Sequence, residues 1–166
     1  MKAVGRAMGE TDDREGAAAA LLGTHALVLG RVAMALLGDA AEVERALEQV
    51  AREAGATPPP AHVTPQAWLL GLVRAVSATQ LSKLPLRPRS ADTAPTTERL
   101  GATDAVPARA ALAALRPTER EAVVLSLVGG LEVADIAAAC NVDAATAKAR
   151  LARGLEQLLR GEGGAR

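Results

Sequence analysis

Aromatic residues are almost absent from this chain of 166 residues, which has one Trp and neither Phe nor Tyr. The core must therefore be built from Leu, Val and Ala, which favours closely packed helices over a sheet. The Asn-Gly and Asp-Gly turns that join hairpin strands are also missing between alternating apolar runs. These absences predict an all-α fold.

The chain also has little cysteine, no net charge and no long uninterrupted apolar run. The single Cys140 excludes an internal disulfide framework. A formal net charge of zero excludes a global basic field that would draw the whole chain onto nucleic acid. No segment approaches the roughly 18 uninterrupted apolar residues of a membrane span. The N-terminus is charged early and lacks the apolar stretch of a signal peptide, so a soluble cytoplasmic protein is expected.

Side chains that could carry catalysis or hold a metal are scattered along the sequence. His25 and His62 are far apart, with no cysteine or carboxylate cluster at metal-ligand spacing. No phosphate-binding loop and no pairing of a nucleophile with a base stands out. We therefore expect no catalytic residue, no metal site and no cofactor. Trp68 and Cys140 are interpreted as residues of the core.

The order of apolar patterns and breaks predicts two small helical domains. Residues 17–84 form the first domain and residues 108–160 the second. Residues 85–107 are rich in Pro, Thr, Asp and Arg with little periodicity, which indicates a flexible linker. Residues 1–16 are expected to form a frayed polar arm.

Helix ends within the first domain have recognisable signals. Gly38 is expected to end one helix, and Asp39 to cap the next. Thr64 and Pro65 are expected to open a third helix, because proline suits the first helical turn. Three helices are therefore predicted in this domain.

The second domain contains the pattern of a helix-turn-helix, in which two short helices cross steeply over a tight turn. Residues 133–140 form the first helix. Asn141 can take the left-handed conformation at the turn, and Val142 lies between the helices as an apolar plug. Asp143 is a good N-cap for the second helix, residues 144–160.

This second helix has basic residues on its flanks and a face of small residues. It carries four basic residues and one acidic residue, so charge is local although the chain is neutral. Basic residues on a helix more often form an ordinary solvated surface, but the turn, plug and cap favour a helix that lies in a major groove with its cations on phosphates. The residues predicted to bind DNA are Asp143, Ala145, Thr146, Lys148, Ala149, Arg150 and Arg153.

Residues 115–160 resemble region four of bacterial sigma factors, particularly the extracytoplasmic-function group. The matching positions are Arg120, Leu125, Leu131, Asp135, Ile136, Ala137, Thr146, Lys148, Arg150, Leu151 and Arg153. Residues 36–50 and 68–76 resemble parts of region two of the same family. The resemblance implies that the chain binds core RNA polymerase and double-stranded promoter DNA, with an anti-sigma factor as a possible partner. The polymerase-binding residues that it implies are Glu44, Arg45, Glu48 and Gln49.

Three functions remain open. The first is a sigma-factor-like protein that directs transcription initiation. The second is a degenerate sigma-like protein that binds polymerase or an anti-sigma partner without melting DNA. This alternative arises because residues 1–84 carry eight basic and nine acidic side chains, whereas displaced single strands are usually held in a cationic groove. The third is a plain helix-turn-helix regulator, in which residues 17–84 are only a dimerisation or sensing unit.

Overall fold

The computed structural model describes the backbone of residues 4–83 and 102–163, and the side chains of residues 16–83 and 108–160. Every regular element in this part of the chain is an α-helix, which confirms the predicted fold class. The helices are α1 (Val4–Leu37), α2 (Ala40–Ala56), α3 (Pro65–Lys83), α4 (Ala102–Ala114), α5 (Pro117–Leu127), α6 (Val133–Cys140) and α7 (Ala144–Gly163).

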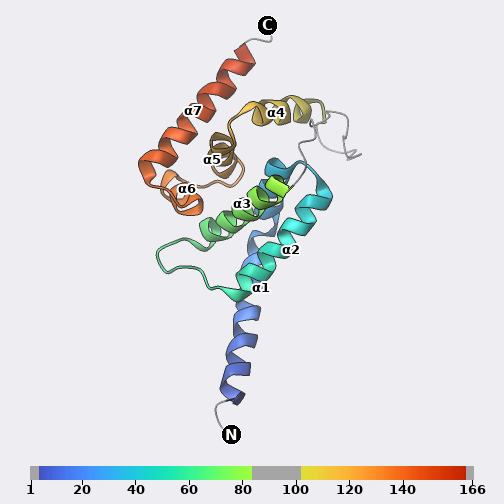
Figure 1. Ribbon diagram of the computed structural model, residues 1–166, viewed down its shortest axis with the longest axis vertical. Coiled ribbons are helices and arrows are strands. Elements are labelled where there is room, and N and C mark those ends of the chain that lie inside the picture. Colours follow the sequence, from blue (N-terminus) through green and yellow to red (C-terminus); the bar gives the residue numbers. More distant parts are fainter. Residues whose placement is uncertain (1–3, 84–101, 164–166) are drawn as a thin grey trace.

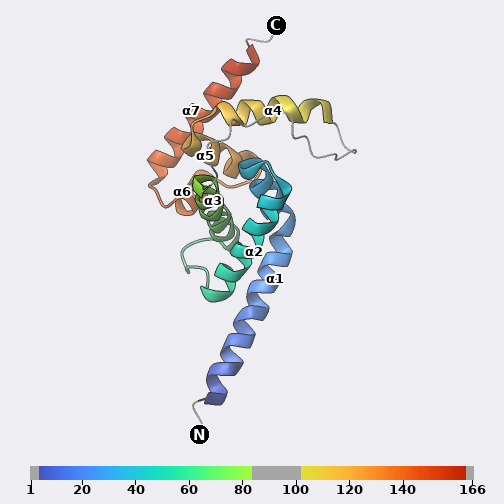
Figure 2. The same ribbon diagram turned by 45° about the vertical axis from the view of Figure 1, so that its right-hand side comes forward.

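The helices form one bundle, from which the beginning of α1 projects (Figures 1 and 2). Helices α1, α2 and α3 pack against one another, and α5, α6 and α7 form the second group. Helix α3 also packs against α6, and α1 against α5, so the two groups are in contact. Helix α7 lies on the opposite side of the bundle from α2 in both views.

The helix ends of the first domain follow their local sequence, as predicted. Gly38 has a φ of +75°, and its N–H donates to the Met34 carbonyl 2.9 Å away. Asp39 caps α2, since its Oδ1 accepts from the Glu42 N–H at 3.0 Å. The Thr64 hydroxyl oxygen accepts from the third residue along α3 at 3.3 Å.

Two helices begin before their predicted starts. Helix α1 begins at Val4, so residues 4–16 of the segment expected to be a frayed arm are helical. Helix α4 begins at Ala102 and includes the last six residues of the predicted linker, while residues 84–101 lie outside the described part. An existing helix gains one hydrogen bond for each residue added, so propagation needs no apolar periodicity.

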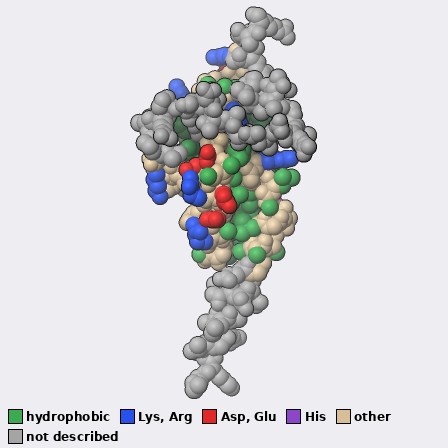
Figure 3. Space-filling view, turned by 90° about the vertical axis from the view of Figure 1, so that its right-hand side faces the viewer, with side chains coloured by type: hydrophobic (Ala, Val, Ile, Leu, Met, Phe, Trp, Pro, Cys, Tyr) green, Lys and Arg blue, Asp and Glu red, His purple; other side chains and the backbone are tan. Residues whose placement is uncertain are grey.

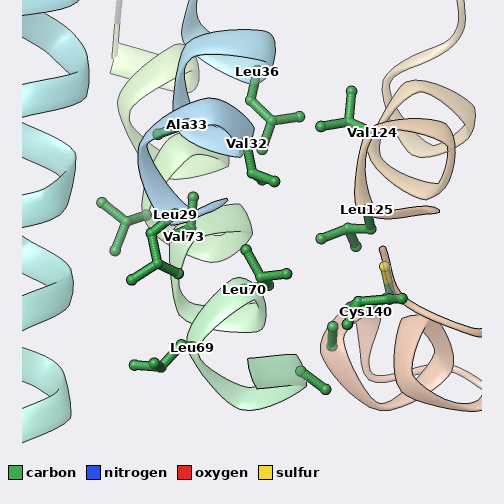
Figure 4. Packing of buried hydrophobic residues seen from close by; sticks show 14 of the residues in the cluster. Leu29, Val32, Ala33, Leu36, Leu69, Leu70, Val73, Val124, Leu125 and Cys140 are labelled. Atoms are coloured by element: carbon green, nitrogen blue, oxygen red, sulfur yellow. The ribbon is translucent and has the colours of Figure 1, made fainter. Parts of the chain in front are cut away.

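Buried residues from both halves form a single apolar cluster around α3 (Figure 4). Helix α3 is central because it packs against α1, α2 and α6. The labelled members of the cluster are Leu29, Val32, Ala33 and Leu36 of α1, Leu69, Leu70 and Val73 of α3, Val124 and Leu125 of α5, and Cys140 of α6.

Polar contacts fix the position of α3 against the second group. The Arg74 Nε donates to the Ala139 carbonyl of α6 at 3.1 Å, and the Gln66 Nε2 donates to the Gly129 carbonyl at 2.7 Å. A Cβ on Gly71 would lie only 3.2 Å from the Cα and the carbonyl oxygen of Ala139. The two helices therefore approach backbone to backbone here, and even one added methyl group would press against Ala139.

The segment Gly16–Leu37 of α1 is long and apolar enough to cross a membrane by length and composition alone, with a mean hydropathy of 1.7. The prediction concerned uninterrupted apolar runs, and it holds in those terms because Thr24, His25 and Arg31 interrupt this segment. In the structure, the Leu29, Val32 and Leu36 side chains of this segment are buried in the helical core.

Candidate nucleic-acid interface

The turn between α6 and α7 has the geometry expected of a helix-turn-helix. Asn141 adopts the left-handed conformation, with φ 52° and ψ 51°. The Val142 N–H donates to the Ala137 carbonyl at 3.0 Å, and the Val142 side chain packs half-buried against the core. The turn and the apolar plug predicted from the sequence are thereby confirmed.

Asp143 caps the first turn of α7, as its side chain was predicted to do. Its Oδ1 accepts from the Thr146 N–H at 2.8 Å, and its Oδ2 accepts from the Thr146 hydroxyl at 2.7 Å. These two hydrogen bonds, the backbone one foremost, lower the pKa of the Asp143 carboxyl below its ordinary value because they favour the charged form.

The lowered pKa of Asp143 predicts an acid-dependent contribution to stability. The carboxylate stabilises the fold fully above the carboxyl pKa of the unfolded chain, and this contribution is lost as pH falls through the lower pKa of the folded state. Asp143→Asn keeps a side chain that can cap a helix but cannot titrate. Thermal unfolding in the acid range is expected to depend less on pH in this variant; equal pH dependence in both proteins would contradict the assignment.

The residues predicted to bind DNA lie on α7 or cap it, and most of them face solvent. Helix α7 buries Ala147 and Gly154 against the rest of the bundle. On other sides of the helix, the exposed members of the predicted set are Asp143, Ala145, Lys148, Ala149 and Arg153, and the half-buried members are Thr146 and Arg150. The small-residue face is therefore free of other parts of the described chain and accessible to a large partner.

Close packing fixes α7 on α5 and α4. A Cβ on Gly154 would lie 2.6 Å from Val123 Cγ2 and 3.2 Å from the Glu119 carbonyl oxygen, so the two helix backbones approach closely here. The Gln157 Nε2 donates to the Ala114 carbonyl at the end of α4, at 3.2 Å. Two neighbouring helices thus hold the middle of α7 in place.

An ion pair that the sequence reasoning did not find lies beside this contact. Arg153 Nε is 3.4 Å from Glu119 Oε1; the Arg153 side chain is 60% exposed, whereas that of Glu119 is only 6% exposed. The pair lines a hollow of about 270 Å³. The other residues that line this hollow are Arg116, Glu156, Gln157 and Arg160. Glu119 and Arg153 are 34 residues apart, so no local pattern in the sequence indicated their pairing.

The residues implied as polymerase-binding lie on α2, away from α7. Glu44, Arg45 and Glu48 are exposed, and Gln49 is half-buried and donates to Glu53 at 2.9 Å. Arg45 also pairs with a glutamate one turn earlier on the same helix. Acidic and basic side chains are interspersed on the side of the molecule seen in Figure 3. The residues predicted to bind DNA and those implied to bind polymerase therefore lie on two separate surfaces.

Comparison with known proteins identifies the helices around this interface. Residues 106–158 match the family model described as Sigma-70, region 4. The match includes α5, α6 and most of α7. The predicted resemblance is thereby confirmed for the part of the chain that contains α7. No match was found among the curated proteins.

Two solved structures share the fold of these C-terminal helices together with that of the N-terminal helices. One is the sigma factor RpoE in complex with the anti-sigma factor NepR from Bartonella quintana, with a TM-score of 0.69, 22% identity, and coverage of 87% of this chain and 97% of that chain. The other is CnrH in complex with the cytosolic domain of CnrY, with a TM-score of 0.69, 16% identity, and coverage of 94% and 96%. At these identities the likeness is one of fold, and it extends over both halves of the chain.

Proposed function

We propose that this chain is a sigma factor that directs transcription initiation by bringing core RNA polymerase to promoter DNA. The observation that carries the proposal is the region 4 match over residues 106–158, which contains an exposed, capped and basic second helix. The fold likeness along nearly the whole chain supports a sigma factor over a plain helix-turn-helix regulator, in which residues 17–84 would be unrelated to that family.

On this proposal α7 docks in the major groove of the promoter. Ala145 and Ala149 allow the helix to approach the bases, but their side chains can offer only apolar contact to thymine methyl groups. Thr146, Lys148 and Arg150 lie on the flanks of that face, and with Arg153 they would bind phosphates. Most of the affinity would then come from the DNA backbone, and the base sequence would be read weakly.

Helix α2 would supply a polymerase-binding surface on the other side of the bundle. Glu44, Arg45 and Glu48 present both signs of charge to solvent, beside the half-buried Gln49. Charged groups at the rim of an interface govern specificity and the association rate more than affinity. Replacing them should therefore slow binding of polymerase without unfolding the chain.

Transcription in vitro with purified core polymerase tests the proposal. The parent chain is expected to give promoter-dependent transcripts on templates selected from genomic fragments. Arg150→Ala with Arg153→Ala should abolish them while polymerase binding survives. If no template gives a product although polymerase is bound, the chain is a sigma-like protein that does not melt DNA.

We infer further that a regulatory protein binds the groove between α1 and α4. Both of the solved structures that share this fold are complexes with a protein partner. The groove has a volume of about 550 Å³ and an apolar lining that includes Leu27, Met34 and Leu112, and Arg31 and Arg109 also line it. This chemistry fits an amphipathic helix with apolar residues on one face and acidic residues on its flanks.

The exposed side chain of Leu27 provides a test of the groove. It is 69% exposed, so Leu27→Glu should leave the fold intact while it places a charge in the apolar lining. The partner isolated with the parent chain from native cells should be lost from this variant. It should be retained by Arg153→Ala, because Arg153 does not line the groove. Retention by both variants would place the partner elsewhere.

A further inference from the structure

Glu119 is a buried carboxylate next to the surface proposed to bind DNA. It lies in the first turn of α5, and its side chain is 6% exposed. Burying a charged group is costly unless the charge is paired. The ion-pair partner is Arg153 of α7, with 3.4 Å between Nε and Oε1. A buried pair of this kind is weak support for stability, because desolvation offsets the attraction between the two charges.

The arginine of this pair can bind a second anion. Arg153 keeps 60% of its side chain exposed, and a guanidinium has five N–H donors in a planar fork. One edge can stay beside Glu119 while the remaining donors bind a phosphate. The close approach at Gly154 and the hydrogen bond from Gln157 already fix the α7 backbone here. The side-chain rotamers are therefore what remains to be ordered when DNA binds.

We propose that Glu119 is a positioning residue for DNA docking, which holds the Arg153 guanidinium in place before the duplex arrives. The inference rests on the proposed function, since it assumes that Arg153 binds a phosphate. An arginine ordered in advance avoids an entropic cost that corresponds to about a two- to tenfold change in affinity. The negative charge of Glu119 also repels phosphates, which weakens DNA binding. Because the two effects oppose each other, the direction of the change in affinity on removing this charge shows which effect is larger.

A double-mutant cycle separates the two effects. Dissociation constants of the full chain are measured by fluorescence anisotropy for a labelled duplex that the parent protein selects from a random pool. Glu119→Gln keeps the shape of the side chain and removes its charge. It is expected to weaken binding about two- to tenfold when Arg153 is present. In an Arg153→Ala background it should leave binding unchanged or tighten it, because only the repulsion is removed.

Glu156→Gln is the matched control for this cycle. Glu156 lines the same hollow and undergoes the same change of charge, but it pairs with Arg160 and its side chain is 62% exposed. This control should bind as tightly as the parent or more tightly. A purely structural role of Glu119 would change affinity by the same factor in both Arg153 backgrounds.

Arg153→Lys keeps the charge and covers the case in which Glu119→Gln fails to fold. A lysine ammonium lacks the planar fork, so it cannot stay paired with Glu119 and bind a phosphate in the same way. Its affinity should lie nearer to that of Arg153→Ala than to that of the parent. Two results would overturn the inference about Glu119 and leave the proposed function intact. In one, Glu119→Gln changes the affinity by the same factor in the parent and in the Arg153→Ala background; in the other, Arg153→Lys binds DNA as tightly as the parent. An unchanged affinity of Arg153→Ala would also contradict the proposed docking of α7.

Discussion

Replacing Gly154 with alanine is expected to lower the free energy of unfolding by about 1–3 kcal/mol, the usual cost of overpacking a core. Alanine is favoured over glycine in a helix interior by about 1 kcal/mol, so helix propensity alone predicts the opposite sign. Packing is expected to prevail because the new Cβ would lie 2.6 Å from Val123 Cγ2. Val123 is 1% exposed and cannot move aside without disturbing the core.

Gly23→Ala is the matched control within α1. A Cβ on Gly23 meets nothing within 4 Å, so this substitution should raise the free energy of unfolding by about 0.5–1 kcal/mol. Urea unfolding of both variants, followed by circular dichroism, measures the two changes. If Gly154→Ala were as stable as Gly23→Ala, the close packing of α7 on α5 would be wrong.

Duplex DNA should bind roughly a hundredfold more weakly, or worse, when Arg150 and Arg153 are both replaced by alanine. Each charge-assisted hydrogen bond contributes about 1.5–3 kcal/mol, and the alanine-rich face of α7 offers little base contact to compensate. The slope of the logarithm of the association constant against the logarithm of salt concentration should also become less negative, by about 0.9 for each lost phosphate contact. Anisotropy titrations at several salt concentrations measure both quantities.

The control for this pair removes the same charge elsewhere. Arg31 and Arg52 are exposed on α1 and α2. Replacing both with alanine should change neither the salt dependence nor the affinity by more than a small factor. If the two double variants bound DNA equally well, the contribution of α7 would be limited to general electrostatic attraction, and the groove assignment would fail.

Local sequence was sufficient to predict the fold class and several of the helix ends. Gly38, Thr64, Asn141 and Asp143 act on groups three or four residues away, so the partners that they need are written beside them in the sequence. The extent of α1 was missed, because a helix can continue past its packed part without an apolar pattern.

Long-range packing decided what the sequence pattern could not. Arg74 donates to the carbonyl of Ala139, 65 residues away, and Gly71 allows the same two helices to touch. Glu119 meets Arg153 only because Gly154 lets α7 lie close to α5. The sequence by itself determined an all-helical chain with a capped, basic second helix, since each of those features depends on neighbours within about one helical turn. The tertiary structure alone decided that both halves share one core and that a buried carboxylate faces Arg153, because the geometry of such contacts depends on how distant helices pack.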